Sequence, residues 1–434
     1  MRDPVESLLA AADIQVGGSR PWDISVHHPG WYQRVWDGRN LGLGESYMDG
    51  WWDCPQLDAF FARLLGSGAE ERLKVTPALA LRTLIHRLFN FQTLVRAKEV
   101  AFRHYDIGND LFQAMLDPTM TYSCGYWRGA ETLEQAQRNK MDLVCAKLML
   151  EPGMRLLDIG CGWGALARHA AERYGDQVVG VTLSEPQRLY AEAACRGLPV
   201  SFRLQDYRSM PPEQFDRIVS IGMFEHVGHR NHAVFMDVVH RHLARDGVFL
   251  LHTIGGGVAS AAGDPWIAKN IFPNGEVPSV AQVSRVMQGR FVMEDWHNFC
   301  ADYDPTLMAW YRNFARHWAE LQDRLDHRFF RMWRYYLLSC AGAFRARSVQ
   351  LWQIVLSKAG VTGGFRVREL QEDGAALAAR RGVRADLSGG SGLDHGGRIL
   401  GAINSGPASS PSSRLGAPGC RCRVRASSAI HETG

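Results

Sequence analysis

The stretch RLLDIGCGWG, Arg155–Gly164, decides the fold of this chain. Its apolar residues predict a buried strand, its glycines predict a tight turn, and the following Ala165–Tyr174 predicts a helix. A strand, a glycine-rich turn and a helix N-terminus in this order are typical of a site for a nucleotide-like ligand in an open α/β sheet. Gly160, Gly162 and Gly164 would let the backbone turn sharply and approach such a ligand closely. A glycine turn with a purely structural role is the alternative.

The residues after this turn distinguish between two classes of cofactor. A dinucleotide site has G-x-G-x-x-G and an acidic residue about 20 positions later, at the end of the second strand. This chain has G-C-G-W-G, and its second predicted strand, Gln177–Val181, runs into Thr182–Ser184 without an acid. The pyrophosphate signature is therefore poor, and S-adenosylmethionine, which has no phosphate, is the better ligand. Asp158, at the end of the first strand, can reach a cationic or hydroxyl-bearing group, and the hydroxyls of Thr182–Ser184 with Gln187 could replace the missing acid.

Residues 140–255 alternate between predicted strands and helices. This pattern indicates the α/β class, with a mostly parallel sheet covered on both faces and ligand residues at the carboxyl ends of the strands. Asp206 and Tyr207 follow the third strand and would flank an adenine. Met223–Gly228 follow the fourth strand, and His252–Gly255 close the fifth. The predicted elements are Arg155–Ile159, Ala165–Tyr174, Gln177–Val181, Glu185–Arg196, Val200–Leu204, Phe215–Ser220, Ala233–Leu243 and Val248–Thr253.

The composition of the chain excludes several classes of protein. Its 434 residues carry a formal net charge of +4, which permits weak attraction to an anionic membrane but gives no argument for nucleic acid. The sequence contains neither an apolar run of about 18 residues nor the apolar core of a signal peptide. The nine cysteines include one close pair, Cys420 and Cys422, and no C-x-x-C, so we expect a reducing cytoplasm without a disulfide framework or zinc. His226, His229 and His232 lack a clear partner ligand, so we expect no metal.

Residues 1–100 are predicted to form a small, mainly helical domain rich in aromatic residues. Its first part has an irregular pattern, whereas Leu57–Leu65 and Pro77–Phe91 have the apolar spacing of helices. The second of these helices and its extension are basic, and a basic amphipathic helix can lie on a membrane. The other interpretation is a helix that packs on the main domain and leaves its basic face in solvent.

The rest of the chain divides into a main domain and a tail. Residues 101–365 contain the alternating pattern, a loop that begins at Gly255, a helical stretch rich in aromatic residues at Leu307–Phe344, and a last strand at Val349–Ser357. The aromatic stretch predicts either the wall of an acceptor cavity or plain helical core. Residues 366–434 are rich in Gly, Ser, Arg, Ala and Pro, and we expect them to be disordered because they have few large apolar residues to bury.

Seven further segments accompany the glycine turn. They are LGLGESYMDGWW (Leu41–Trp52), HYDIGNDLF (His104–Phe112), TYSCGYW (Thr121–Trp127), GMFEHVG (Gly222–Gly228), HTIG (His252–Gly255), DPWIAKNIFPNG (Asp264–Gly275) and MEDWHNF (Met293–Phe299). Together they resemble the cyclopropane fatty-acyl-phospholipid synthases, with the mycolic acid cyclopropane synthases as more distant relatives. The resemblance covers roughly residues 10–365. It implies a class I, Rossmann-like methyltransferase domain with a mostly parallel seven-stranded sheet.

The resemblance also implies a reaction on the double bond of a lipid acyl chain. Methyl transfer from the sulfonium of S-adenosylmethionine to a cis alkene gives a carbocation, a base removes a proton from the new methyl group, and the ring closes. Such a site needs a base and surroundings that exclude water. In the family the base is a bound bicarbonate, and its holders correspond to Cys124, Glu225, His252, Tyr303 and the backbone of Ile254. Glu225 would position His252 or accept the protonated oxygen of bicarbonate.

The cofactor contacts form a second set, carried over from the family together with Asp158 at the strand end. Cys340 is expected near the site, without a catalytic role. The cofactor set is Tyr122, Ser123, Asp158, Gly160, Cys161, Gly162, Thr182, Leu183, Ser184, Gln187, Asp206 and Tyr207.

The resemblance implies membrane phospholipids with unsaturated acyl chains as the acceptor, no nucleic acid, a homodimer, and a cytoplasmic enzyme associated peripherally with the inner membrane surface. Aromatic and basic residues before Ala101 would make the membrane contact. Three other functions stay open. One is a fatty-acyl methyltransferase with a methyl- or methylene-branched product. The second is a non-catalytic lipid- or nucleoside-binding protein, against which the intact set of base-holding residues argues. The third is a small-molecule N- or O-methyltransferase, which would not need the N-terminal part.

Overall fold

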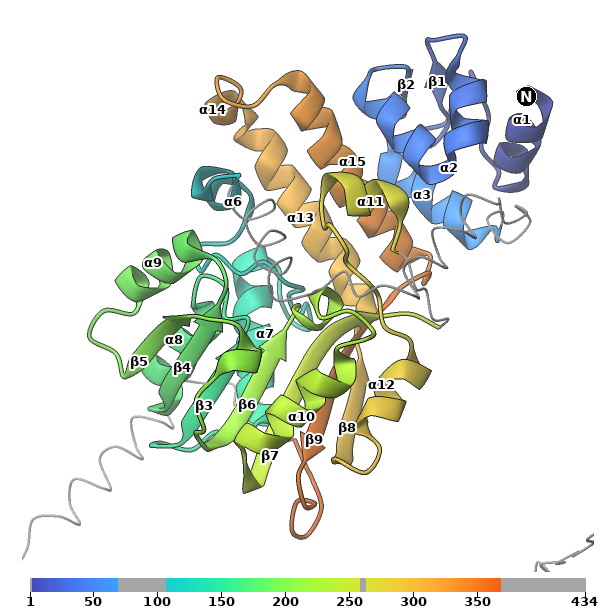
Figure 1. The fold of residues 1–434 in the computed structure, drawn as a ribbon. Helices are drawn as coiled ribbons and strands as arrows, with labels where there is room; N and C mark the ends of the chain where they lie inside the picture. Colours follow the sequence, from blue (N-terminus) through green and yellow to red (C-terminus); the bar gives the residue numbers. More distant parts are fainter. Residues whose placement is uncertain (1, 69–106, 258–262, 368–434) are drawn as a thin grey trace, which may run out of the picture. The chain divides into compact units, whose positions relative to one another are not determined.

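The part of the chain that the structure describes belongs to one compact unit, residues 1–370. The computed structural model describes residues 2–68, 107–257 and 263–367 (Figure 1). The predicted helix Pro77–Phe91, the start of the His104–Phe112 segment and nearly all of the predicted tail lie outside these residues. The disorder of the tail and the division into three domains therefore stay predictions.

A seven-stranded sheet confirms the predicted α/β class and its mostly parallel strands. The order is β5-β4-β3-β6-β7-β9-β8. The strands from β5 to β7 are parallel to their neighbours, whereas β9 pairs antiparallel with both β7 and β8. The strands are β3 (Arg155–Ile159), β4 (Gln177–Thr182), β5 (Val200–Leu204), β6 (Phe215–Ile221), β7 (Leu243–Gly255), β8 (Val292–Asn298) and β9 (Gln350–Ser357).

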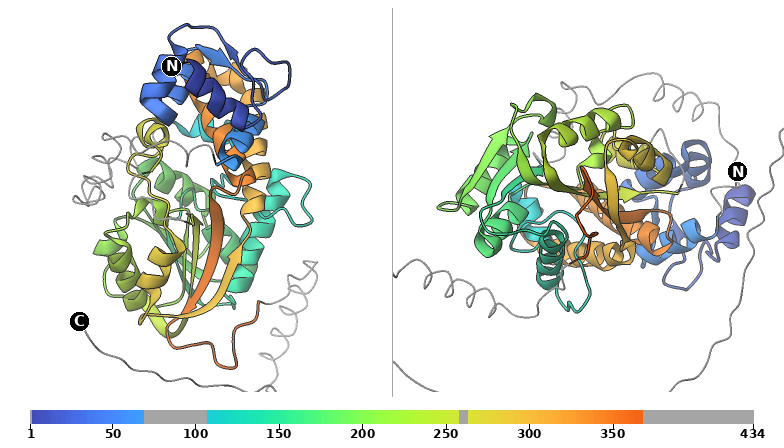
Figure 2. Two further views of the ribbon diagram at one scale, coloured as in Figure 1. Left: turned by 90° about the vertical axis from the view of Figure 1, so that its right-hand side faces the viewer. Right: turned by 90° about the horizontal axis from the view of Figure 1, so that it is seen from below.

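Helices cover both faces of this sheet, as two views at right angles show (Figure 2). The cluster on one face joins strand residues to α10 and α12, and the cluster on the other joins strand residues to α7 and α8. Strands that are buried on both faces need apolar residues at successive positions, which explains the continuous apolar run of β3. These helices and the neighbouring α9 are α7 (Leu133–Lys147), α8 (Ala165–Tyr174), α9 (Glu185–Ala194), α10 (His232–His242) and α12 (Val280–Met287).

A helical part with its own aromatic core adjoins the sheet. The predicted stretch Leu307–Phe344 is divided among three helices, α13, α14 and α15. The N-terminal helices share a core with α13 and α15, and Trp31, Trp52, Trp310 and Trp333 are all buried in it. The helices are α1 (Arg2–Ala11), α2 (Trp31–Met48), α3 (Leu57–Gly66), α6 (Asn109–Met115), α11 (Pro265–Asn270), α13 (Tyr303–Arg316), α14 (Trp318–Leu321) and α15 (His327–Arg345). The short elements are β1 (Ser25–Val26), β2 (Trp52–Asp53), η1 (Tyr207–Ser209), η2 (Phe224–His226) and η3 (Cys300–Asp302).

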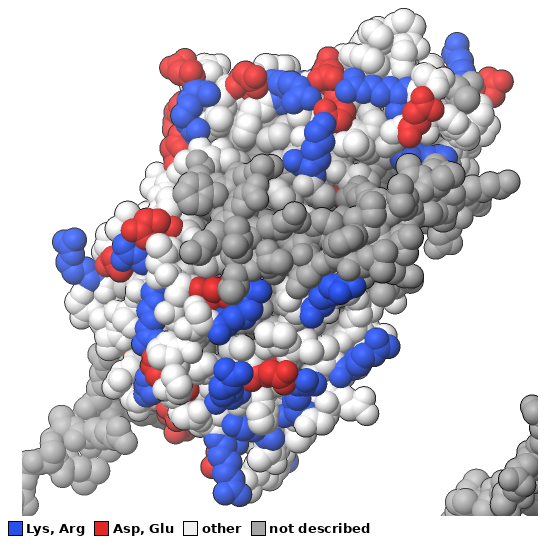
Figure 3. Space-filling model, viewed as in Figure 1, with Lys and Arg blue, Asp and Glu red and all other residues white. Residues whose placement is uncertain are grey.

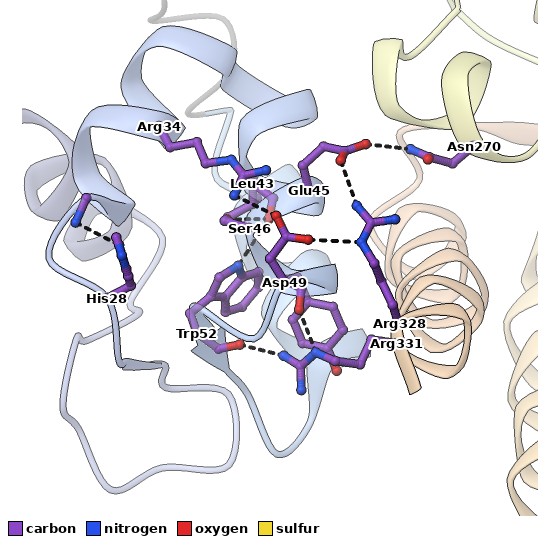
Figure 4. Close-up of polar contacts among 12 residues, drawn as sticks. His28, Arg34, Leu43, Glu45, Ser46, Asp49, Trp52, Asn270, Arg328 and Arg331 are labelled. Atoms are coloured by element: carbon purple, nitrogen blue, oxygen red, sulfur yellow. Dashed lines mark hydrogen bonds and ion pairs between the residues drawn. The ribbon is translucent and has the colours of Figure 1, made fainter. Parts of the chain in front are cut away.

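Ion pairs and hydrogen bonds fix α2 to α15 and α11 (Figure 4). Arg328 on α15 donates to Glu45 and Asp49, in each case at 3.0 Å. The other oxygen of Glu45 accepts from Asn270 at the end of α11, at 3.2 Å. Arg331 donates to the carbonyl oxygen of Trp52 at 2.8 Å. One carboxylate on α2 therefore links three helices that are far apart in the sequence.

Two parts of the fold differ from the sequence-based expectation. Residues 2–48 were expected to be irregular but contain α1 and α2. Helix α2 includes three glycines and a kink at Arg39, where φ is 50°, so its sequence lacks the regular apolar spacing of a helix. It is instead stabilised by close packing, because a Cβ on Gly44 would lie 2.3 Å from a Trp266 side-chain atom. The resemblance implied seven strands, but the position of β8 was not predicted, because this strand is partly exposed and its sequence is largely polar.

The surface agrees with the modest net charge. On the face seen in Figure 3, Lys and Arg side chains are interspersed with Asp and Glu over both the N-terminal helices and the sheet. Within the described ranges, no helix has the length and apolar character needed to cross a membrane.

Candidate active site

A cavity lies at the carboxyl ends of β3, β4, β5 and β6, where the alternating pattern placed a ligand site. All twelve predicted cofactor residues line it. The predicted cofactor set did not include several other lining residues, among them Lys140, Trp163, Arg208 and Phe272, whereas His226 belongs to the Met223–Gly228 segment that was expected at this edge. The cofactor roles of the twelve residues stay predictions, but their side chains and backbone surround one space.

The glycine turn brings the backbone to the edge of this cavity. Gly160 has a φ of 86°, and a Cβ there would lie 2.9 Å from the Met223 side chain. Its N–H donates to the carbonyl of Val181 at 2.9 Å, which fixes the turn to the end of β4. Gly164, with a φ of 83°, begins α8, and a Cβ there would lie 2.9 Å from Ala191. At both positions glycine is required by conformation and by space.

Two buried ionisable residues, Asp158 and Lys140, line the cavity and act on each other electrostatically. Burial raises the pKa of Asp158 to about 7, and the charge of Lys140 opposes this rise. Burial also lowers the pKa of Lys140 to about 8. The Lys140 Nζ donates to Ser123 Oγ at 2.8 Å. A sequence signal for Lys140 existed, because it occupies the position of a core residue between Leu133 and Val144 on α7.

The polar residues after β4 and β5 are largely bound to one another. Thr182 donates through its hydroxyl to Gln187 Oε1 at 2.9 Å and accepts from the Ser184 N–H at 3.2 Å. The Asp206 carboxylate accepts two hydrogen bonds from the Arg208 guanidinium, at 2.8 and 2.7 Å. Asp206 was expected to flank an adenine together with Tyr207, and the structure adds that its carboxylate is part of an ion pair with Arg208.

Three predicted catalytic residues, Cys124, Glu225 and Tyr303, lie near one another and beside Tyr122 in the wall of the cavity. Burial, followed by the charges of Cys124 and Glu225, holds the pKa of Tyr303 well above its usual value. The weaker effects of Tyr122 and Cys340 on the same group agree with the expected place of Cys340 near the site. The Tyr303 ring stacks on Phe344, with ring centroids 4.4 Å apart. The Tyr303 hydroxyl is therefore a hydrogen-bond donor that keeps its proton.

Glu225 and the backbone of Ile254 are directly bonded. The Ile254 N–H donates to Glu225 Oε1 at 2.6 Å. The second oxygen, Oε2, is buried without a hydrogen-bond partner in the described part of the chain. Burial raises the pKa of Glu225 to about 7. The Ile254 amide, expected to bind an anion, is thus occupied by the Glu225 carboxylate.

His252 has different surroundings from those expected. Burial lowers the pKa of His252 well below its usual value, so the ring is neutral. Its Nδ1 lies 3.4 Å from Gln353 Nε2 on β9, and its ring contacts Phe299 edge-on. Among the described residues, no hydrogen bond or ion pair joins Glu225 to His252. If Gln353 donates to Nδ1, the proton of the neutral ring is on Nε2, where it can be donated to an anion.

Comparison with known proteins shows the family. A family model described as mycolic acid cyclopropane synthetase matches residues 92–354. The cyclopropane-fatty-acyl-phospholipid synthase of Escherichia coli (strain K12) is 54% identical over 360 residues, which are 83% of this chain and 94% of that protein. The chain belongs to the cyclopropane-fatty-acyl-phospholipid synthase family.

Several solved structures are similar to this chain. The cyclopropane synthase MmaA2 from Mycobacterium tuberculosis has a TM-score of 0.57 and 37% identity, and the match covers 60% of this chain and 98% of that one. The mycolic acid cyclopropane synthase CmaA1, solved with SAH and CTAB, has a TM-score of 0.56 and 35% identity, over 60% of this chain and 98% of that one. A coclaurine N-methyltransferase at 21% identity, with a TM-score of 0.61 over 73% of this chain and 99% of that one, shows the fold alone. Members of this family are S-adenosylmethionine-dependent methyltransferases, so the chain is one as well.

Proposed function

We propose that the protein transfers a methylene group from S-adenosylmethionine to the cis double bond of unsaturated acyl chains in membrane phospholipids, with bicarbonate as the base. The observation that carries this proposal is the pairing of two sites: a cavity lined by the twelve cofactor residues, and a group formed by Cys124, Glu225 and Tyr303 beside Tyr122 of its wall. The relative from Escherichia coli, similar over most of both chains, supports the same reaction and substrate.

The residues present fit a small anion beside the cofactor cavity. Glu225 Oε2 is buried and lacks a partner among the described residues, and a bound hydroxyl group would satisfy it. Tyr303 offers a donor that keeps its proton, and His252 offers a second one. S-adenosylmethionine supplies the methyl group, and bicarbonate, when bound, supplies the basic oxygen that the side chains lack.

The side chains of the protein prepare this site. With a pKa of about 7, Glu225 can hold a proton at Oε2 or accept one from a neighbouring hydroxyl. Its Oε1 meanwhile fixes the backbone of Ile254 at the end of β7. Buried aromatic rings, among them Trp310 and Phe344, exclude water, which would otherwise trap a lipid carbocation as an alcohol.

The decisive test is a product analysis. Purified protein is incubated with S-adenosylmethionine and vesicles of a cis-monounsaturated phospholipid, and the released fatty acids are examined by mass spectrometry and proton NMR. We expect a gain of one CH2 and upfield cyclopropane signals, and we expect product formation to fall in buffer stripped of carbon dioxide and to recover when bicarbonate is added. Product formation that is independent of bicarbonate would contradict the proposed base.

Substitution of Tyr303 tests the group formed by Cys124, Glu225 and Tyr303. Tyr303→Phe removes a donor and not a wall of the cofactor cavity, so we expect it to lower turnover by roughly 100-fold or more while S-adenosylhomocysteine affinity is retained. Tyr174→Phe, at the end of α8, is the matched control and should retain both.

One alternative has a specific observation in its favour. A probable fatty acid methyltransferase from Pseudomonas putida is 36% identical over 285 residues. A methylene-branched product has the same mass as a ring, so olefinic instead of upfield NMR signals would favour this second function.

Membrane docking, dimerisation and a cytoplasmic location belong to the same proposal. The basic extension of the N-terminal part contains Arg96 and Lys98, outside the described residues. Replacing both with Glu should weaken co-sedimentation with anionic vesicles, and unchanged binding would contradict a membrane role for this segment. Sedimentation equilibrium tests the homodimer.

A further inference from the structure

Lys140 is a buried cation whose role the proposed reaction leaves unexplained. Its side chain is 2% exposed, and it lines the cofactor cavity from α7. Its Nζ donates to Ser123 Oγ at 2.8 Å, and the charges that act on it come from Asp117, Cys124 and Asp158, in decreasing order. Burying a charged lysine is unfavourable unless an anion or hydrogen bonds compensate for the lost solvation.

The hydrogen bond from Lys140 restricts where the hydroxyl proton of Ser123 can point. Because the ammonium group can only donate, the Ser123 hydroxyl accepts from Lys140, and its own proton must point elsewhere. The backbone carbonyl of Ser123 accepts from Gln137 on the same helix at 2.8 Å, which holds this residue against α7. The side chain therefore presents an O–H donor, backed by a positive charge, at the wall of the cavity.

The charges around the cavity fit a zwitterion. Among its described lining residues, the side chains of Lys, Arg, Asp and Glu are Lys140, Asp158, Asp206 and Arg208. Arg208 is already bound to Asp206 at 2.7 Å, so Lys140 and Asp158 are the other two charged residues among these lining residues. S-adenosylmethionine has one anionic group, the α-carboxylate of its methionine part, beside an ammonium group. A cation and an acid in one place suit the two groups of that amino-acid end.

We infer that Lys140, through Ser123, is a positioning residue that recognises the α-carboxylate of the cofactor and so orients the amino-acid end of S-adenosylmethionine. This inference rests on the proposed function, because it assumes that nucleoside in the cavity. It assigns Lys140 a role in binding in addition to its place in the packing of α7.

The same helix provides a matched control. Lys147, two turns further along α7, is also 2% exposed, but it pairs with Asp295 on β8 at 2.8 Å and does not line the cavity. Lys140→Met and Lys147→Met each remove one buried ammonium group from the same helix, so both affect folding. Only the first removes a charge from the cavity.

The experiment compares two nucleosides by calorimetry in buffer without added bicarbonate. S-adenosylhomocysteine has the α-carboxylate, and 5′-methylthioadenosine lacks the whole amino-acid end. For Lys140→Met we expect affinity for S-adenosylhomocysteine to fall about 10- to 100-fold, as for a lost charge-assisted hydrogen bond, with 5′-methylthioadenosine affinity unchanged. Ser123→Ala should have an effect of the same kind, and the double variant should lose less than the product of the two single losses.

Three outcomes would overturn the inference. Unchanged S-adenosylhomocysteine affinity would show that Lys140 does not recognise the carboxylate. Equal losses of affinity for S-adenosylhomocysteine and 5′-methylthioadenosine would show that Lys140 has a structural role only. Thermal melting of Lys140→Met and Lys147→Met would check that conclusion. Wild-type protein that binds neither nucleoside would contradict the proposed function itself, and the inference with it.

Discussion

At the scale of single residues, Glu225 makes folding stability depend on pH. Its pKa is raised to about 7 from 4.5, so the folded state holds this proton more tightly than the unfolded chain does. The free energy of unfolding should therefore fall as pH rises from about 4.5 to 7. The Glu225→Gln variant has no carboxylate to titrate here, so its free energy of unfolding should not show this decrease. Relative to wild type, its stability should therefore increase between pH 4.5 and 7 by at most about 3 kcal/mol.

The measurement is urea unfolding of both proteins at pH 5 and pH 8 without cofactor. His226, whose pKa burial lowers to about 4, works in the opposite direction below pH 6.5 and is present in both proteins, so it cancels in the comparison. Replacing the exposed Glu131 with Gln is the control and should leave the difference near zero. A Glu225→Gln difference that does not grow with pH would contradict a buried, protonated Glu225.

At the scale of elements, the turn between β3 and α8 is the sharpest test of the cofactor cavity. Gly160→Ala and Gly153→Ala both place a Cβ at positive φ, 86° and 90°, so both should cost about 1–2 kcal/mol of stability. Only at Gly160 would the new atom meet a neighbour, Met223 at 2.9 Å. We expect a loss of S-adenosylhomocysteine affinity for Gly160→Ala alone, measured by calorimetry. Equal affinity losses in the two variants would point to a general effect of strain.

The link between α2 and α15 is a second feature at this scale. The Glu45 carboxylate is largely buried, and Arg328 donates to it at 3.0 Å. A double-mutant cycle of Glu45→Gln and Arg328→Gln, followed by urea unfolding, should give a coupling free energy of about 1 kcal/mol. The ion pair is partly screened, so the coupling should decrease in high salt. Additive effects of the two substitutions would show that the pair contributes nothing to helix packing.

The elements also show what the sequence could predict. The bounds of β3, β5 and α8 were predicted correctly, because apolar runs and glycine turns are local signals. Helix α2 and strand β8 were missed, because tertiary packing outweighs their weak local patterns. The rule that ligands bind at the carboxyl ends of strands predicted that the residues after β3, β4 and β5 would share one site, and they line one cavity. Tyr122 and Ser123, which precede the sheet, were predicted from the family resemblance alone. Lys140 was missed although it lies at a core position of the α7 pattern, because a charged residue is expected on the solvent face of a helix. The bond between Ile254 and Glu225 was missed because it depends on how β7 and η2 pack.

At the scale of the whole molecule, the N-terminal helices and the rest of the unit should unfold together. Phe60 on α3 is fully buried in the core that α15 shares. Phe60→Ala should lower the free energy of unfolding by about 3–5 kcal/mol. Far-UV circular dichroism and loss of S-adenosylhomocysteine binding should report one transition at the same denaturant concentration. The control, Leu189→Ala at a 53% exposed position, should change stability by less than about 0.5 kcal/mol. Separate transitions for the two probes would contradict a single cooperative unit.

The position of β9 has a consequence for biosynthesis. This strand comes last of the described elements, yet it lies inside the sheet, between β7 and β8. During synthesis on the ribosome, one edge of β7 stays unpaired until β9 has been made. An unpaired strand edge can pair with another nascent chain and so promote aggregation. Gln353, the partner of the His252 ring, arrives with this same strand. Strand β7 and the His252 ring therefore gain their β9 partners at the same late stage of translation, and a chain interrupted before residue 350 would have neither partner.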